Sequence, residues 1–234
     1  MALYAIGDLH LSFSTDKPMD VFGSQWKDYE EKIKASWVKN ISETDTILIP
    51  GDISWAMRLE DAKVDLEWIH NLPGRKILLR GNHDYWWSSL KKLQALYEDV
   101  DFLQNNFYTY TGDGGTYAIC GTRGWVSPNP NKFDEDDERI YNRELLRLKL
   151  SLDAAKAAGH EKILVMTHYP PTNESKEHSA FMDIYESYGV EKVIYGHLHT
   201  AASFKCGLQG DFDGVSYQLT SCDYLDFEPV KLLD

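Results

Sequence analysis

The chain contains 234 residues, of which 43% are hydrophobic and 26% charged, and its formal net charge at pH 7 is −13. These fractions are close to the globular average, so they indicate neither a disordered chain nor a membrane protein. The negative charge argues against long nucleic acid as a partner, because proteins that bind it need basic surface to neutralise phosphates.

Five short apolar runs, taken in chain order, predict buried strands. Each is too short for a helix and rich in Ile, Leu, Val or Tyr, and they cover residues 2–6, 46–50, 76–80, 162–167 and 192–195. Apolar runs of this length are typical of strands that are buried on both faces of a sheet.

Stretches with helical periodicity lie between these runs. Residues 26–41 follow Ser24, a residue type that caps helices, and residues 62–69 stop before a Pro-Gly pair. Residues 145–158 end at Gly159 and predict a long helix. Strand alternating with helix predicts an α/β fold.

Two segments predict hairpins and therefore some antiparallel sheet. Residues 102–110 are expected to pair with 116–120, and residues 203–206 with 215–220, each through a Gly-rich turn. No internal repeat or low-complexity linker interrupts the chain, so we expect one domain over residues 1–234.

Each of the five apolar runs ends in a polar cluster. The clusters are Gly7-Asp8-Leu9-His10, Gly51-Asp52, Gly81-Asn82-His83-Asp84, His168, and Gly196-His197-Leu198-His199. In open α/β sheets, ligands bind in the crevice outside the carboxyl ends of the strands. We therefore expect clusters that are far apart in the sequence to meet at one site.

These clusters combine oxygen and imidazole ligands without thiolate. Such a set suits divalent Mn, Fe, Zn, Co or Ni. Alternate side chains of Asp-x-His and His-x-His point to the same side of an extended strand end, so both can reach one centre. Seven candidate ligands exceed the roughly four that one ion takes from protein, which predicts two metal ions about 3.5–4 Å apart.

The ordered blocks D-x-H, G-D, G-N-H-[DE], H and G-H-x-H resemble those of the calcineurin-like metallophosphoesterases. They span positions 8 to 199. The resemblance implies two stacked mixed β-sheets flanked by helices, and hydrolysis of a phosphate ester by a hydroxide activated between two divalent metal ions, with Mn the ion of choice in vitro.

The resemblance also implies a role for each block residue. Asp8, His10 and His199 hold the first metal, Asn82, His168 and His197 hold the second, and Asp52 bridges the two. His83 is expected beside the metals as the acid that serves the leaving group, since an imidazole in that place can protonate the leaving oxygen.

Protein Ser/Thr phosphatases of this superfamily carry an acid three residues after the G-D aspartate, within G-D-x-V-D-R-G. Here Asp52 is followed by Ile53-Ser54-Trp55, which argues against a protein phosphatase and leaves the partner that orients His83 open. Asp84 is adjacent in sequence, but successive side chains of an extended segment point in opposite directions.

The substrate class is open at this stage. A small phosphodiester or nucleotide-like substrate is favoured over a monoester, because the sequence shows no extra cluster of Arg and Lys for a dianion. The alternatives are a phosphomonoesterase, a non-catalytic metal-binding scaffold of the same fold, and a nuclease, which the net charge disfavours. The sequence indicates no membrane partner and no particular oligomeric state.

Several loop residues have two interpretations. Trp55, Trp86, Trp87 and Trp125 either wall a substrate pocket or pack at the bases of the loops. Arg123 is the best-placed loop cation for a substrate phosphate, although a surface ion pair is the commoner use of such a residue.

The remaining polar features have structural explanations. The acidic run 134–138 is interpreted as a helix start rather than a calcium site, because helix N-termini favour acids. Cys120, Cys206 and Cys222 are odd in number and widely spaced, which argues against disulfides and favours a cytoplasmic location.

Overall fold

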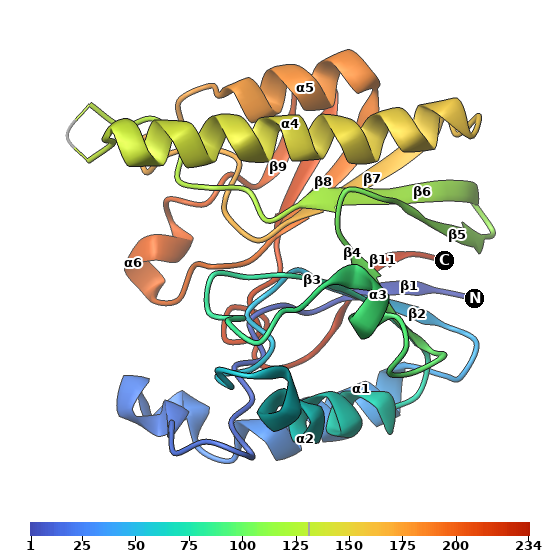
Figure 1. Ribbon diagram of the computed structural model, residues 1–234, viewed down its shortest axis with the longest axis vertical. Coiled ribbons are helices and arrows are strands. Elements are labelled where there is room, and N and C mark those ends of the chain that lie inside the picture. Colours follow the sequence, from blue (N-terminus) through green and yellow to red (C-terminus); the bar gives the residue numbers. More distant parts are fainter. Residues whose placement is uncertain (131) are drawn as a thin grey trace.

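The computed structural model describes residues 1–130 and 132–234, in which two β-sheets lie face to face with helices on both outer faces (Figure 1). The predicted α/β fold with two stacked mixed sheets is confirmed. Among the described residues, no helix combines the length and the apolar composition required to cross a bilayer.

The first sheet has the strand order β11-β1-β2-β3-β4. Its strands are β1 (Leu3–Ala5), β2 (Thr46–Ile49), β3 (Arg75–Leu79), β4 (Val100–Leu103) and β11 (Val230–Leu233). The first four are parallel, and β11 returns from the C-terminal end of the chain to pair antiparallel with β1.

The second sheet has the order β5-β6-β7-β8-β10-β9. Its strands are β5 (Tyr108–Gly112), β6 (Gly115–Thr122), β7 (Lys162–Thr167), β8 (Val190–Tyr195), β9 (Gly210–Phe212) and β10 (Val215–Leu219). Strands β6, β7, β8 and β10 are parallel, and the edge strands β5 and β9 are antiparallel to their neighbours.

The longer helices cover the outer faces of the two sheets (Figure 1). They are α1 (Tyr29–Asn40) and α2 (Leu59–His70) on the first sheet, and α4 (Glu135–Ala157) and α5 (Ala180–Tyr188) on the second. Short elements occupy the loops: α3 (Leu90–Leu93), α6 (Ala201–Phe204) and the 3₁₀ turns Met19–Phe22 and Ser24–Trp26.

Three apolar clusters explain why the strands read as continuous apolar runs. In β1, Leu3 and Ala5 point into the cluster between the sheets, whereas Tyr4 and the following Ile6 point into the cluster under α1 and α2. Successive side chains of a strand face opposite sides, so a strand in the middle of four layers needs apolar residues at every position.

The five predicted strands are confirmed at β1, β2, β3, β7 and β8, but both predicted hairpins need correction. Residues 203–206 do not form a strand, because the Thr200 hydroxyl accepts a hydrogen bond from the Ser203 N–H and caps the short helix α6. The antiparallel partner of β10 is instead β9. Residues 102–110 split between the sheets: residue 102 lies in β4, and only β5 pairs with β6.

Helix starts differ from the prediction where a cap was missed. Helix α4 begins at Glu135 rather than 145, because the Asp134 side chain accepts from the N–H groups of Asp136 and Asp137. The acidic run is thus a helix start, as expected. Helix α1 begins at Tyr29, and Ser24 opens a 3₁₀ turn instead.

The carboxyl ends of the central strands meet at one edge, where backbone hydrogen bonds join the two sheets. The Gly7 N–H donates to the carbonyl of Thr220 at 2.7 Å, and the Cys222 N–H donates to the carbonyl of Gly7 at 3.0 Å. The loop after β1 also binds the loop after β2, through the Asp8 N–H and the carbonyl of Gly51 at 2.9 Å. This edge therefore holds loops from both sheets in fixed positions.

Candidate metal centre

The first group of candidate ligands brings together Asp8, His10 and His199, whose ligand atoms lie within 4.8 Å of one another. His10 Nε2 is 3.1 Å from His199 Nε2, and His199 Nε2 is 3.7 Å from Asp8 Oδ1. Asp8 and His10 follow β1 of the first sheet, whereas His199 follows β8 of the second.

The second group brings together Asn82, His168 and His197. Asn82 Oδ1 is 2.7 Å from His168 Nε2 and 2.9 Å from His197 Nδ1, and these two nitrogens are 3.2 Å apart. Neighbouring ligands of an octahedral ion at about 2.1 Å are about 3.0 Å apart. The three atoms therefore already have the spacing of one face of a coordination shell.

Asp52 lies between the two groups. Its Oδ2 is 3.8 Å from His10 Nε2 of the first group and 3.5 Å from His168 Nε2 of the second. Its Oδ1 accepts a hydrogen bond from the His83 backbone N–H at 2.8 Å, which fixes the carboxylate orientation. One carboxylate oxygen thus faces both groups, the arrangement that a bridging ligand requires.

Two of the imidazoles are oriented by acceptors behind them. His168 Nδ1 is 3.1 Å from the carbonyl oxygen of Pro50, and His199 Nδ1 is 3.0 Å from Asp223 Oδ1. An acceptor at Nδ1 requires the proton there, so in the neutral imidazole, which is the form that binds a metal, the Nε2 lone pair faces the site. Such partners orient metal-binding histidines in general.

The backbone is strained at four of the candidate ligands. Asp8, His10, Asp52 and His197 have positive φ angles of 57°, 46°, 51° and 71°. Non-glycine residues avoid this region, and where they adopt it they cluster at functional sites. The turns that end the strands thus direct these side chains toward the site, and the backbone conformation that does so is locally unfavourable.

Two glycines pack directly against the carboxylates. A Cβ atom at Gly81 would overlap the carboxylate of Asp52, and a Cβ atom at Gly196 would overlap that of Asp8. No other residue type leaves this space, so the glycines of the G-N-H and G-H-x-H blocks set the positions of the two acids.

The pKa values of the buried ligands favour the binding of a cation. Burial raises the pKa of Asp8 to about 7, and burial likewise raises the pKa of Asp52. Burial lowers the pKa of His168 to about 3 and that of His197 to about 2, so both imidazoles are neutral. Neutral imidazoles and closely spaced buried carboxylates are good ligands, and bound positive charge offsets the cost of ionising the acids.

Thiolate takes no part in the arrangement. Cys222 is buried beside Asp8, and its thiol donates to the Asp8 carbonyl oxygen at 3.0 Å. The donor set of the two groups is therefore oxygen and imidazole alone, which fits the divalent ions expected from the sequence.

The sequence profile of the calcineurin-like phosphoesterase family matches residues 1–201. The chain belongs to this family. The resemblance found in the sequence is thus confirmed over most of the chain.

Individual relatives are distant. A probable cyclic nucleotide phosphodiesterase from Vesicomyosocius okutanii subsp. Calyptogena okutanii (strain HA) is 24% identical over 171 residues, which cover 69% of this chain and 65% of that protein, slightly under two thirds of its length. A protein of unknown function from Aquifex aeolicus shares the fold with a TM-score of 0.52 at 17% identity, over 98% of this chain and 95% of the other. The phosphopantetheinyl hydrolase of Mycobacterium tuberculosis has a TM-score of 0.63 at 14% identity, over 99% and 95%.

In this calcineurin-like phosphoesterase, His83 stands beside the two groups rather than in either. Its side chain is 36% exposed, and its Nε2 is 4.0 Å from Asp52 Oδ2. The ring centroid lies 4.3 Å from that of Trp55 and 5.8 Å from that of His10. The imidazole is therefore near the centre and accessible from outside.

Asp84 does not orient His83. It is fully buried, and its carboxylate accepts hydrogen bonds from the backbone N–H groups of Ile53, Ser54 and Gly81 and from Trp86 Nε1. Asp84 instead ties the loop after β2 to the loop after β3. Trp86 is correspondingly a packing residue at the loop base.

The two candidate substrate residues lie in different places. Trp55 stacks on His10 at 5.0 Å and lines a cavity with His83, whereas Arg123 stacks on Trp125 at 4.6 Å, with Nη2 3.9 Å from Glu144 Oε1. Trp55 therefore borders the candidate centre. The Arg123 side chain faces a separate cavity.

Sequence reasoning missed two residues that touch the ligands. Asp223 holds His199, and Tyr169 lies against His197 with ring centroids 4.2 Å apart. Asp223 comes shortly after β10, just as the candidate ligands come shortly after their strands. A sixth polar cluster at a strand end could therefore have pointed to it. Tyr169 carries no such signal, because nothing in the sequence marks it except its position next to His168.

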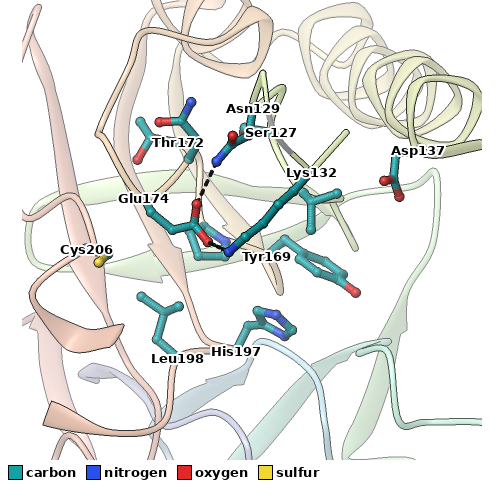
Figure 2. A pocket seen from close by; sticks show the side chains of 13 residues that line it. Ser127, Asn129, Lys132, Asp137, Tyr169, Thr172, Glu174, His197, Leu198 and Cys206 are labelled. Carbon is teal, nitrogen blue, oxygen red and sulfur yellow. Dashed lines mark hydrogen bonds and ion pairs between the residues drawn. The ribbon is translucent and has the colours of Figure 1, made fainter. Parts of the chain in front are cut away.

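One cavity adjoins each ligand group. A cavity of about 260 Å³ borders His10 and His199 and is walled by Trp26, Trp55 and Met19. A cavity of about 300 Å³ borders His197 and Tyr169 (Figure 2).

The second cavity has a polar wall. In Figure 2, Glu174 accepts hydrogen bonds from Asn129 at 2.7 Å and from Lys132 at 3.1 Å, on the side away from His197. The two cavities thus offer surfaces of different chemistry: aromatic rings wall the first, whereas the second combines this polar wall with a mostly apolar remainder.

Proposed function

We propose that this chain hydrolyses a small phosphodiester with the help of two divalent metal ions. The observation that carries the proposal is the position of Asp52, whose Oδ2 faces histidines of both ligand groups within 3.8 Å. Membership of the calcineurin-like phosphoesterase family supports the reaction class.

The proposal assigns Asp8, His10 and His199 to one ion and Asn82, His168 and His197 to the other, with Asp52 between them. The neutral imidazoles, the buried carboxylates and the strained turns support this assignment. When bound, the two ions supply positive charge that stabilises the phosphoryl group in the transition state and makes water a better nucleophile.

His83 is proposed to donate a proton to the leaving oxygen. Its imidazole is outside both ligand groups, is exposed on one side, and has Trp55 against its ring. A general acid must reach the leaving group without being held by a metal ion, and His83 meets both conditions. The leaving alcohol then occupies the aromatic cavity that His83 and Trp55 share.

The two cavities support a diester over a monoester. A diester carries two organic groups on one phosphorus atom. The phosphate would lie between the two ligand groups, and the cavity beside each group could then take one of the organic groups. A monoester fills only one of them. The name of the distant relative, a probable cyclic nucleotide phosphodiesterase, agrees with this choice.

Metal analysis and a paired activity assay test the proposal. After saturation with Mn²⁺ and removal of excess, we expect two ions per chain, and faster turnover of bis(p-nitrophenyl) phosphate than of p-nitrophenyl phosphate. One ion or fewer with full activity contradicts the two-metal centre. Faster turnover of the monoester favours a phosphomonoesterase, and two ions without turnover of either ester favour a non-catalytic scaffold.

The proposed partner is a small phosphorylated molecule in the cytoplasm. The cysteines of the described residues are unpaired, which suits a reducing compartment. A net charge of −13 opposes long nucleic acid, so a gel shift at low salt is expected to be negative. Tight, salt-sensitive binding of DNA would instead favour a nuclease.

A further inference from the structure

Four arginines converge on a cavity that includes none of the seven candidate ligands. The cavity has a volume of about 150 Å³ and lies where β3, β4 and β6 end against α4. Its arginines are Arg80, Arg123, Arg143 and Arg147, contributed by two strand ends and by one helix. This concentration of positive charge occurs in a chain with a net charge of −13.

One acid in the cavity accounts for two of the four guanidinium groups. Glu144 Oε1 accepts hydrogen bonds from Arg143 at 3.2 Å and from Arg147 at 2.8 Å, and Oε2 accepts from the Thr122 hydroxyl at 2.6 Å. Glu144 is the only acidic residue lining the described part of the cavity. Its single charge leaves the set of four arginines with an excess of positive charge.

The other two guanidinium groups have donors without acceptors. Within residues 1–130 and 132–234, the Arg80 side chain has no hydrogen bond or ion pair, and its Nε is buried. Arg123 Nε is also buried without a partner, and the contact between Arg123 and Glu144 is 3.9 Å long. Buried donors without acceptors are costly, so these side chains are complementary to an anion.

We propose that this cavity binds a phosphoryl group at a second site beside the metal centre. Guanidinium groups match phosphate because each offers two parallel N–H donors to two oxygens, and several of them can surround a tetrahedral dianion. The Trp125 ring holds the Arg123 guanidinium from behind at 4.6 Å, which prearranges it for that contact.

The site is coupled in space to the ligand loops. The Arg123 carbonyl accepts the N–H groups of His168 and Tyr169, each at 3.0 Å, and Arg80 directly precedes Gly81 in the G-N-H block. Phosphate in this cavity is either a second phosphate of the substrate or a free phosphate ion that binds on its own.

Calorimetric titration of the Mn²⁺-loaded protein with inorganic phosphate tests the proposal. We expect two classes of site in the natural chain, one at the metals and one at the arginines. Arg80→Gln and Arg123→Gln should each weaken the second class at least about tenfold, because each removes charge-assisted hydrogen bonds. Arg139→Gln, a change of an exposed arginine on α4 that pairs with Asp136, should leave both classes intact.

Asp52→Asn supplies the reciprocal control, because it should remove the metal class and keep the arginine class. The proposal is overturned if both arginine variants titrate like the natural chain, or if Asp52→Asn abolishes all phosphate binding. Thermal unfolding of both arginine variants checks for misfolding. Arg80→Gln is the decisive variant, because among the described residues its guanidinium has no ion pair to lose, whereas Arg123 contacts Glu144 and Trp125.

A kinetic comparison identifies the source of the phosphate, and this step alone rests on the proposed diesterase activity. The substrates are thymidine 5′-(p-nitrophenyl phosphate) with and without a 3′-phosphate. If the substrate supplies the second phosphate, Arg80→Gln raises KM only for the 3′-phosphorylated form. If KM changes for neither form while the titration loses its second class, the site takes free phosphate.

Discussion

Asp84→Asn is expected to destabilise the protein strongly although the two side chains have the same shape. Asp84 Oδ1 accepts from Ile53, Ser54 and Trp86 at 2.9, 3.1 and 3.0 Å, and Oδ2 accepts from the Gly81 N–H at 2.7 Å. An asparagine keeps the oxygen on the side with three donors and turns its NH₂ group toward Gly81.

The magnitude follows from these contacts. The variant loses the hydrogen bond to Gly81 and leaves the new NH₂ group and the Gly81 N–H, both buried donors, facing each other. It also removes the charge that strengthens the other three bonds. Together these effects should lower the free energy of unfolding by about 3 kcal/mol. For a chain of this size that corresponds to a fall in melting temperature of about 6–12 °C. The G-N-H loop should also shift, which lowers Mn²⁺ content at the group that contains Asn82.

The assay is thermal unfolding at pH 8 beside Asp16→Asn, the same chemical change on an exposed side chain. Burial and the charge of Asp52 raise the pKa of Asp84 to about 7. The folded chain therefore holds this proton more tightly than the unfolded chain, and the stability from Asp84 falls as the pH rises through 7, so the difference between the natural chain and Asp84→Asn should be larger at pH 6 than at pH 8. A fall within about 1 °C of the control at pH 8 would refute the role of Asp84 as the clamp between the two loops.

Three further changes test the centre itself. Asp52→Asn should lose both ions rather than one, because the carboxylate faces both groups, and retention of two ions in elemental analysis would contradict the bridge. His83→Ala should keep its metal content but slow an alkyl phosphodiester by about 10²–10⁴-fold more than the matching p-nitrophenyl ester, since only the alkoxide needs a proton to leave; equal losses would remove the acid role. Although burial lowers the pKa of His199, the hydrogen bond to Asp223 and the charges of Asp8, Asp223 and Asp52 together outweigh it and raise the pKa to about 9. Because the pKa is raised, protonated His199 stabilises the metal-free fold by up to about 3 kcal/mol. This stabilisation is complete below about pH 6.5 and is lost as the pH rises through 9. Urea unfolding in chelator at pH 7 and pH 10 should show the loss in the natural chain but not in His199→Gln.

The candidate ligands could be predicted from the sequence because their signal is local. Each comes shortly after an apolar run. Because the strands formed by these runs are parallel, their carboxyl ends lie at the same edge of the sheets. Asp223 was missed for a topological reason: β10 was interpreted as half of a hairpin, so its carboxyl end was not counted with the others. In the structure β10 is parallel to β8.

Features that depend on distant residues could not be predicted. The sequence shows no cluster of basic residues, yet the sheet ends bring Arg80 and Arg123 to the same cavity as two arginines of α4. The partners of Asp84 lie up to 31 positions away and are mostly backbone groups, which leave no trace in side-chain pattern. Three-dimensional convergence of this kind depends on which strands become neighbours.

Each ligand group draws on both sheets, and this has a consequence for the order of folding. The four parallel strands of the first sheet end at residue 103, whereas His168, His197 and His199 follow strands of the second. A growing chain that has formed only these four strands lacks one member of the first group and two of the second, so it can complete neither. Tight metal capture is therefore a late event that follows docking of the two sheets, so a partly folded chain has little power to withdraw metal ions from its surroundings.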